Sequence, residues 1–369
     1  MLFTPLTLRG VQLRNRIAVS PMSQYAAVDG RVGDWHLVSL GARAAGGAGL
    51  VMVEATAVSP EARGTIGDVG LWDDTHIAPL AHVASFIRSM GAVAGIQLQH
   101  AGPKACTMLP WEGGRHLAAD DPAAWPIYGP TDAPFGGHLL RAPVAMSRAD
   151  LRKVAADFAG AARRAVEAGF QLVQIHAAHG YLVQSFLSPF SNRRSDEYGG
   201  TPDSRSRLLR EIVAAIREVL PDGTPLSVRL GAADFNAEGV QLDESIELAR
   251  RLSVEGVDLL DVSVSFSGPV AANLPWDEPA FLTPTAGIIR EAAGIMTASS
   301  WAIDTPEMAE RALGEGRIDL VMLGRASLMD PNWPIKAAVA LGEPDPASRL
   351  PVQHGFWLKR WLKGGRALR

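Results

Sequence analysis

The feature that most limits the fold of this chain is a regular alternation of short apolar runs with longer amphipathic runs. The short runs are almost continuously apolar, as expected for strands that are buried on both faces. Eight runs are predicted to be strands: Ile17–Pro21, Leu50–Glu54, Val93–His100, Leu172–His176, Leu226–Leu230, Leu259–Val264, Ile295–Ala298 and Leu320–Gly324. Strands that alternate with helices in this way predict an α/β fold with a parallel sheet.

The longer runs carry apolar residues at helical spacing. They predict helices over His76–Met90, Ser147–Ala168, Asp203–Leu220, Asp243–Glu255, Thr283–Ala293, Thr305–Gly314 and Asn332–Leu341. Ser147, Asp243 and Thr305 are predicted N-caps, because their side chains can accept the free N–H groups of a first helical turn. Pro306 follows Thr305 at the first helical position, which proline favours.

Two folds share this alternation, a (β/α)8 barrel and an open doubly wound sheet, and periodicity alone does not separate them. An open sheet would gather its reactive residues at one switch point, whereas a barrel brings the C-terminal ends of all its strands to one mouth. Polar residues end nearly every predicted strand: Ser20, Ser23, Glu54, Gln97, Gln99, His100, His176, Arg229, Ser263, Ser265, Ser299, Ser300 and Arg325. We therefore expect a (β/α)8 TIM barrel with an N-terminal hairpin.

The chain of 369 residues is expected to form a single domain, because a barrel of about 250 residues with insertions accounts for that length. Residues 101–146 are rich in proline and glycine and include Trp111 and Trp125. This segment is too long for an ordinary connection and is predicted to be a capping insertion over the mouth. The tail, residues 351–369, combines aromatic and basic residues. Docking on the barrel or on a neighbouring subunit is expected, with a membrane surface as the alternative.

Composition narrows the class of function. The 35 basic and 39 acidic residues nearly balance, which argues against a nucleic-acid partner. No apolar run approaches the roughly 20 residues that span a bilayer, and the N-terminus lacks the layout of a signal peptide. The one cysteine, Cys106, cannot form an internal disulfide. A cytoplasmic enzyme that acts on a small molecule is expected.

The densest group of reactive side chains is His176, His179 and Tyr181, directly after the fourth predicted strand. Two imidazole N–H donors beside a phenol can hold a substrate oxygen and deliver a proton. A metal site is the alternative: with His100 as a further ligand, the chain would be a metal-dependent lyase or hydrolase. Histidines with a purely structural role would give the same pattern.

Arg229 lies inside a predicted barrel strand. A guanidinium keeps its charge, so its burial requires an anionic partner. A carboxylate such as that of Asp261 can serve, and so can a cofactor that becomes anionic on reduction.

Two other strand ends suggest ligand contacts. Gly324 and Arg325 follow the eighth predicted strand, where barrels of this kind bind phosphate through backbone N–H groups and a cation. Gln97 and Gln99 have the same parity on the third strand. Their amides suit the edge of a heterocycle, and a buried polar network would look the same in the sequence.

Nine segments together indicate a family: Phe3–Leu6, Asn15–Ile17, Ser20–Met22, Val53–Ala55, Gln97–Gly102, His176–Tyr181, Phe186–Pro189, Asn192–Gly200 and Leu323–Arg325. With them the chain resembles the Old Yellow Enzyme family of FMN-dependent ene-reductases, in its bacterial branch near the xenobiotic reductases. The resemblance covers nearly the whole chain, and its most specific part runs from His176 to Gly200.

The resemblance implies bound FMN, transient NADPH and an electron-poor alkene as substrate, reduced in a ping-pong reaction by a homodimer or homotetramer. It implies that His176 and His179 bind the substrate oxygen, that Tyr181 donates the proton and that Tyr25 contacts the substrate. The residues implied to bind FMN are Ser20, Pro21, Met22, Ser23, Ala55, Gln97, Arg229, Gly324 and Arg325.

Two positions depart from the family pattern. Ser23 stands where this branch commonly has cysteine. The tail has Phe356 and Trp357 where relatives can end in an arginine that reaches a neighbour's site. An aromatic contribution across a subunit interface is therefore expected.

Overall fold

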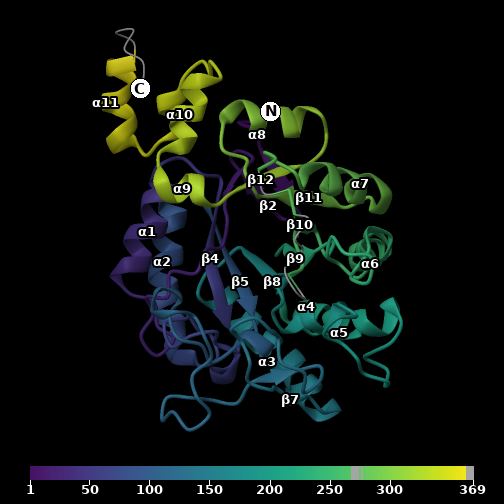
Figure 1. Ribbon diagram of the computed structural model, residues 1–369. Helices are drawn as coiled ribbons and strands as arrows, with labels where there is room; N and C mark the ends of the chain where they lie inside the picture. The colour runs from purple at the N-terminus through teal and green to yellow at the C-terminus, as the bar shows by residue number, and fades with distance from the viewer. Residues whose placement is uncertain (267–273, 276, 363–369) are drawn as a thin grey trace.

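The computed structural model describes residues 1–266, 274–275 and 277–362, and its centre is a closed barrel of eight parallel strands (Figure 1). In the order in which they pair, the strands are β10 (Leu259–Ser263), β11 (Met296–Ser299), β12 (Leu320–Leu323), β3 (Ile17–Val19), β4 (Leu50–Ala57), β5 (Val93–Gln99), β8 (Leu172–Ala177) and β9 (Leu226–Gly231). Each strand lies within a few residues of its predicted range. The predicted (β/α)8 barrel is confirmed, and the open sheet is wrong.

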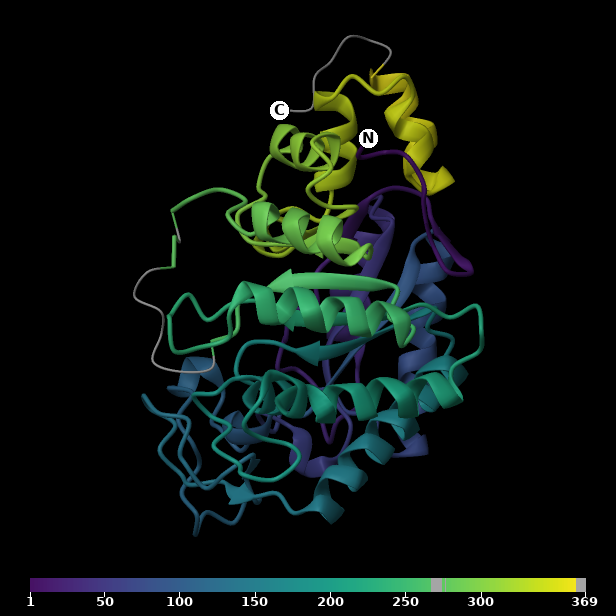
Figure 2. The same cartoon turned by 90° about the vertical axis from the view of Figure 1, so that its right-hand side faces the viewer.

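Helices surround the barrel, and α5, α6 and α7 lie side by side along it in Figure 2. The predicted helices form α2 (Ile77–Ser89), α3 (Arg148–Glu167), α5 (Pro202–Val219), α6 (Leu242–Val254), α7 (Thr283–Ala293), α8 (Pro306–Gly314) and α10 (Trp333–Ala340). Among the described residues, four further helices were not predicted: α1 (Asp34–Ala45), α4 (Leu182–Leu187), α9 (Arg325–Met329) and α11 (Val352–Leu362).

Helix caps explain part of this outcome. Ser147 and Thr305 cap α3 and α8 as predicted, accepting the backbone N–H groups of Asp150 and Met308. Asp243 is not a cap, because α6 begins one residue earlier and Asp243 falls in its first turn. Helix α1 has no side-chain cap, since its N-cap residue is Gly33. This helix therefore lacks the sequence signal by which a helix start is recognised.

An antiparallel hairpin of β1 (Leu6–Leu8) and β2 (Val11–Leu13) precedes the barrel, as predicted. Leu8 and Leu13 belong to one buried apolar cluster with Leu50, Leu172 and Leu320, which begin three barrel strands. The hairpin therefore packs on the N-terminal end of the barrel. The loops that follow the strands meet at the opposite end, which we call the mouth.

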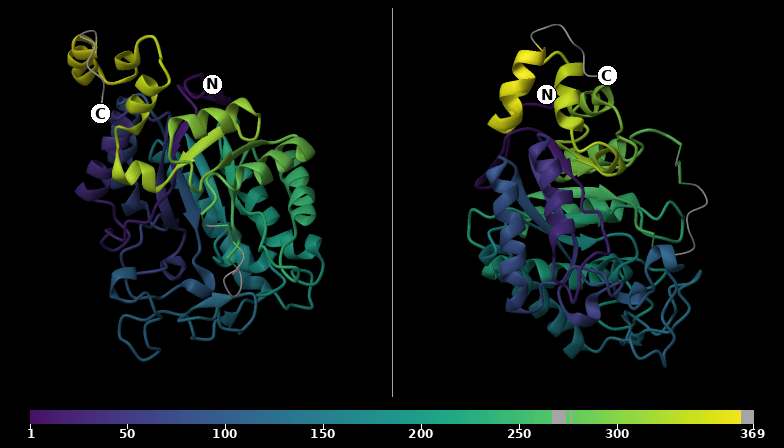
Figure 3. Two further views of the ribbon diagram at one scale, coloured as in Figure 1. Left: turned by 45° about the horizontal axis from the view of Figure 1, so that its top comes forward. Right: turned by 90° about the vertical axis from the view of Figure 1, so that its left-hand side faces the viewer.

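Residues 101–146 contain two short 3-10 helices, η3 (Gly102–Lys104) and η4 (Pro110–Glu112), and a two-stranded pair of β6 (Tyr128–Gly129) and β7 (Val144–Ala145). This segment lies on the side of the molecule opposite α10 and α11 (Figures 2 and 3). That it forms a capping insertion of a single domain stays a prediction.

Helix α11 docks on the 3-10 helix η5 (Pro346–Arg349). The contact is close at Gly355, where a Cβ would lie 2.6 Å from the carbonyl oxygen of Ala347. Phe356 and Trp357 on the same helix are exposed. The end of the predicted tail, residues 363–369, lies outside the described residues. No helix in the described part of the chain is long and apolar enough to cross a membrane, and the expected cytoplasmic location stays a prediction.

Candidate active site

Polar side chains line the inside of adjacent barrel strands. The amide of Gln97 on β5 donates a 2.8 Å hydrogen bond to Gln174 on β8, whose own amide donates to Ser227 on β9 at 3.1 Å. Sequence reasoning missed Gln174. Its signal was parity, because residues two apart on a strand share a face and Gln174 is two residues before His176.

Arg229 and Asp261 form a buried ion pair between neighbouring strands, with Nε and Oδ2 separated by 3.3 Å. A guanidinium N–H of Arg229 also donates to the hydroxyl of Ser300 at 3.2 Å. Burial raises the pKa of Asp261, while the charge of Arg229 opposes that rise. Of the two anionic partners considered for Arg229, the carboxylate is therefore present.

The turn after β8 brings His176, His179 and Tyr181 together, as predicted. The ring of His176 lies 5.0 Å from that of His179 and 4.7 Å from that of Tyr181, centroid to centroid. His179 has a φ of 60° and Gly180 a φ of 72°, so the chain reverses sharply here. This left-handed pair of residues directs three reactive side chains to one place.

A backbone hydrogen bond determines which ring nitrogen of a neutral His176 carries the proton. Its Nδ1 accepts the backbone N–H of Ala178 at 3.3 Å, so the ring proton lies on Nε2. Burial, assisted by the charges of Arg229 and Lys104, holds the pKa of His176 well below its usual range. The imidazole is therefore neutral at neutral pH and presents one N–H donor.

His179 is held by residues of two other strand ends. Its Nε2 lies 2.7 Å from the hydroxyl of Ser263, which also accepts the indole N–H of Trp301 at 3.2 Å. When the hydroxyl donates to Nε2, the ring proton of His179 is on Nδ1 and available to a ligand. Burial and then the charge of Arg229 hold the pKa of His179 well below its usual range.

Tyr181 is fully protonated at neutral pH. Burial raises the pKa of its phenol far above the usual value, and nearby Tyr25 and Asp68 raise it further. The ammonium of Lys104 lies 5.1 Å from the centre of the Tyr181 ring. The turn thus carries two neutral imidazoles and a protonated phenol.

Lys104 is a contact of this turn that sequence reasoning missed. Its ammonium donates a 3.0 Å hydrogen bond to the carbonyl oxygen of His179. Burial lowers the pKa of Lys104 to about 8. Its only signal was its place near the start of the predicted insertion, shortly after the Gln97–Gly102 segment.

Two aromatic residues of the segment 101–146 contact the mouth. The ring of Phe135 packs on Gly180, where a Cβ would lie 2.5 Å from a ring carbon. The ring of Trp111 meets that of Tyr25 edge to face, with centroids 5.8 Å apart. These contacts support the predicted capping role of the segment.

The residues expected to bind FMN lie in the C-terminal halves of β4, β5 and β9 and in the segments that follow β3 and β12, all of which open onto the same mouth. The hydroxyl of Ser20 is buried and has no hydrogen-bond partner among the described residues. A Cβ on Gly324 would meet no atom closer than Met22 Sδ at 4.0 Å, so the backbone after β12 is open to a ligand. Arg325 begins α9 and is exposed. These features fit FMN.

The metal-site alternative relies on His100 as a further ligand. Nδ1 of His100 accepts the backbone N–H of Gly102 at 3.0 Å, and burial lowers its pKa to about 4. Across residues 1–266, 274–275 and 277–362, no group of three histidine, cysteine, aspartate or glutamate side chains could hold a metal ion. The described residues therefore offer no set of ligands for the metal site that was considered as the alternative.

Sequence comparison gives close matches over most of the chain. The profile of the NADH:flavin oxidoreductase / NADH oxidase family matches residues 1–343. An NADPH dehydrogenase of Geobacillus sp. is 43% identical over 344 residues, which are 93% of this chain and 95% of the relative. An NADH:flavin oxidoreductase of Gibberella zeae is 40% identical over 344 residues, covering 89% of this chain and 83% of the relative.

Solved structures share the architecture. Morphinone reductase in complex with tetrahydroNAD matches with a TM-score of 0.75 and 26% identity, covering 96% of each chain. A 2-naphthoyl-CoA reductase matches with a TM-score of 0.83 and 27% identity over 93% of this chain. This chain spans about half, 52%, of that longer protein.

Proposed function

The chain belongs to the NADH:flavin oxidoreductase / NADH oxidase family, and on that premise we propose that it reduces electron-poor alkenes with hydride from NADPH. It is an FMN-dependent oxidoreductase of the Old Yellow Enzyme family, and relatives at about the 42% identity level are NADPH dehydrogenases. The observation that carries the alkene proposal is the turn after β8. Two neutral imidazoles and a protonated phenol meet there in a buried mouth.

FMN, when bound, accepts a hydride from NADPH and passes it to the substrate. We assign its binding to Ser20, Pro21, Met22, Ser23, Ala55, Gln97, Arg229, Gly324 and Arg325. The unpartnered hydroxyl of Ser20 and the open backbone at Gly324 support this assignment. The Arg229 guanidinium is paired with Asp261, and its other N–H groups can donate to an anionic ligand.

His176 and His179 bind the carbonyl or nitro oxygen of the alkene in this proposal. The N–H at Nε2 of His176 and the remaining N–H of His179 donate to that oxygen, and both stay neutral for the reasons given above. Donation strengthens as negative charge grows on the oxygen, so it favours attack at the β-carbon. A donor of this kind contributes on the order of 10²–10³ in rate.

Tyr181 donates the proton that completes the reduction. Its raised pKa keeps the phenol protonated at neutral pH, and its contact with His176 places it next to the bound oxygen. The β-carbon gains the hydride, the α-carbon gains the proton of Tyr181 and the solvent reprotonates the phenolate. NADPH becomes NADP⁺, so the electrons balance.

We further propose a homodimer or homotetramer. Large apolar side chains are exposed on α1, α9 and α11, which lie on one side of the molecule in Figure 1: Trp35, Val38, Met329, Phe356 and Trp357. An exposed apolar surface of this kind favours a protein interface. Deletion of the tail after residue 354 should reduce oligomerisation and alter substrate kinetics. Unchanged kinetics would refute a contribution of Phe356 and Trp357 to a neighbour's site.

Half-reaction kinetics test the proposed function directly. The purified protein with FMN is reduced anaerobically by NADPH in a stopped-flow instrument and then mixed with enones, enals or nitroalkenes. Reoxidation should be fast with alkenes that carry an electron-withdrawing oxygen group and slow with simple alkenes. Equal reoxidation by both classes would contradict the role of the two histidines.

A further inference from the structure

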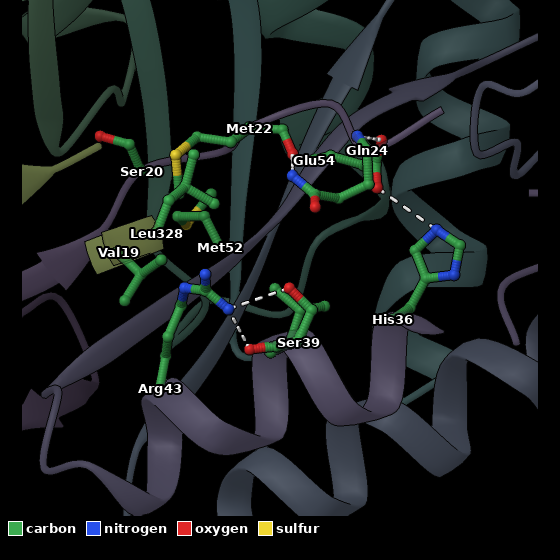
Figure 4. A pocket seen from close by; sticks show the side chains of 11 residues that line it. Val19, Ser20, Met22, Gln24, His36, Ser39, Arg43, Met52, Glu54 and Leu328 are labelled. Atoms are coloured by element: carbon green, nitrogen blue, oxygen red, sulfur yellow. Dashed lines mark hydrogen bonds and ion pairs between the residues drawn. The ribbon is translucent and has the colours of Figure 1, made fainter. Parts of the chain in front are cut away.

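Glu54 occupies an irregular position in β4. Val53 pairs with Ile96 of β5, but Ala55 pairs with the very next residue, Gln97, so Glu54 is an extra residue in the ladder. Bulges of this kind re-aim a side chain and are frequent beside active sites. The side chain of Glu54 is 3% exposed. It turns away from the barrel interior toward α1 and the loop after β3 (Figure 4).

The carboxylate of Glu54 has two close contacts. Its Oε2 accepts the backbone N–H of Gln24 at 2.6 Å, and its Oε1 lies 3.3 Å from Nε2 of His36 on α1 (Figure 4). Nδ1 of His36 accepts the backbone N–H of Gly33 at 3.1 Å. Nε2 of His36 forms an ion-pair contact with the carboxylate but no hydrogen bond to it or to any other described residue.

The residue after Gln24 is Tyr25, whose backbone is in the left-handed region with a φ of 54°. Such a conformation costs a non-glycine residue about 1–3 kcal/mol and persists only where the surroundings enforce it. On one side Gly67 touches the Tyr25 backbone, since a Cβ on Gly67 would lie 2.4 Å from the Tyr25 carbonyl oxygen. On the other side the N–H of Gln24 is fixed by Glu54.

Burying a carboxylate costs several kcal/mol unless its partners compensate. The hydrogen bonds between barrel strands form without a buried carboxylate. The carboxylate of Glu54 instead accepts the N–H of Gln24, in the turn that carries Tyr25. Burial raises the pKa of Tyr25 to about 12, and the charges of Asp68 and Glu54 contribute to that rise. The Tyr25 phenol also lies near enough to raise the pKa of Tyr181.

We propose that Glu54, held by His36, is a positioning residue that fixes the turn of Gln24 and Tyr25 and so places the Tyr25 phenol against the substrate. The inference rests on the proposed alkene reduction and on the contact between Tyr25 and the substrate that the family resemblance implies. Ser20 and Met22, both assigned to FMN, line the same small pocket as Glu54 and His36. The clamp, which consists of Glu54 and His36, therefore joins α1 to the loop that serves both ligands.

The first test is the substitution Glu54→Gln. An amide of the same shape has one acceptor oxygen where the carboxylate has two, so it cannot both accept the Gln24 N–H and keep a negatively charged oxygen beside His36. Hydrogen exchange at the Gln24 amide should accelerate at least about tenfold, and the Kd of p-hydroxybenzaldehyde, a phenol that resembles the substrate enolate, should rise about tenfold, the loss expected for one hydrogen bond. Unchanged exchange at Gln24, or unchanged phenol binding, would overturn the proposal.

Asp319→Asn is the matched control. Asp319 is a buried carboxylate just before β12, at the opposite end of the barrel, where it accepts from Arg290 and from the backbone N–H of Thr297. This variant should lower Tm and leave phenol binding and Gln24 exchange unchanged. Should Glu54→Gln fail to fold, His36→Asn removes the other residue of the clamp. The same changes in Gln24 amide exchange and in the Kd of p-hydroxybenzaldehyde are expected for it.

A double mutant separates positioning through Tyr25 from a general structural effect. In a Tyr25→Phe background, Glu54→Gln should change the phenol Kd less than about twofold, because the group that it positions is gone. A further tenfold loss would overturn the proposal. Failure of the unsubstituted protein to bind the phenol would count against the proposed function instead, and Gln24 exchange would then decide on the clamp alone.

Discussion

The mouth of the barrel has two sides that are built differently. The β8 side consists of His176, His179 and Tyr181 on one turn, and all three are neutral because burial opposes their charged forms. The β3–β4 side carries Tyr25 on a left-handed turn between two buried carboxylates, those of Glu54 and Asp68.

We propose that residues of the β8 side take part in the reaction, whereas Glu54 on the β3–β4 side positions Tyr25. On the β8 side the reactive groups follow one strand and one turn, so a single local structure places them. On the β3–β4 side the position of Tyr25 depends on contacts with a bulge in β4 and with residues near Gly67. We therefore expect substitutions on the β8 side to change rates strongly, and those that disturb the β3–β4 side to change binding more modestly.

The largest effect is expected for Tyr181→Phe, which removes the proposed proton donor and keeps the ring. Alkene reduction should slow by about 10²–10⁴, the usual contribution of a general acid. Flavin reduction by NADPH should be nearly unchanged, since that step needs no proton from Tyr181. Stopped-flow measurement of the two half-reactions checks this prediction, and equal losses in both would contradict it.

His176→Ala should have the next largest effect. In the proposed function its Nε2–H donates to the substrate oxygen, and a hydrogen bond to a charged oxygen contributes about 1.5–3 kcal/mol. The Kd of p-hydroxybenzaldehyde should therefore rise roughly 10- to 100-fold. Titration of its long-wavelength charge-transfer band measures this change. A band that saturates at the same concentration in the variant would exclude His176 from the binding of the oxygen.

Acidification should change the free energy of unfolding in opposite directions through the buried histidines and through Asp68. For His100, with a native pKa of about 4, and for His176 and His179, whose pKa values are also lowered, the unfolded state binds more protons below pH 6.5. Stability then falls as the pH drops through that window, by roughly 1 kcal/mol for His100 between about pH 7.5 and 5.5. Urea unfolding at both pH values measures the loss, and stability that rose on acidification would contradict it.

Asp68 should act in the opposite direction. Burial raises its pKa from 3.8 to about 6, so the native state binds more protons between these values and gains stability as the pH falls. Asp68→Asn removes that gain, and the variant should lose stability more steeply on acidification than the unsubstituted protein. A shallower loss would show that Asp68 is charged in the native state throughout this range.

The smallest effect is expected for Lys104→Met, which tests the contact between the segment 101–146 and the β8 side. The variant loses the hydrogen bond to the His179 carbonyl and should lower the free energy of unfolding by about 1 kcal/mol. Lys336→Met is the control, because Lys336 forms a surface ion pair with Asp330, and such pairs often contribute nothing measurable, so its loss should stay below about 0.5 kcal/mol. Equal small losses in both variants would mean that the Lys104 contact is no stronger than a surface pair.

Much of the fold could be predicted because buried parallel strands have a local signature. Each of the eight apolar runs became a barrel strand, and the turn after β8 was evident from three polar residues close in sequence. Helix α1 was missed, since Gly33 gives no capping signal and Trp35 and Val38 turn apolar side chains outward. Because α1 was not predicted, the position of His36 next to the barrel was not predicted either.

The positioning contacts could not be predicted, since each depends on pairing between distant segments. The bulge at Glu54 is a property of the register between β4 and β5 and has no local pattern. Lys104 meets the carbonyl of His179, a residue 75 positions away in the chain. Gln174 could have been found, since it shares a face of β8 with His176.

The crystal structure of the FMN-loaded protein with p-hydroxybenzaldehyde would test most directly whether the β8 side binds the substrate oxygen. We predict that the phenolate oxygen lies within hydrogen-bond distance of His176 Nε2 and of His179, with the Tyr25 phenol also in contact with the ligand. A phenolate oxygen bound elsewhere, with both imidazoles bonded only to protein groups, would contradict the proposed function.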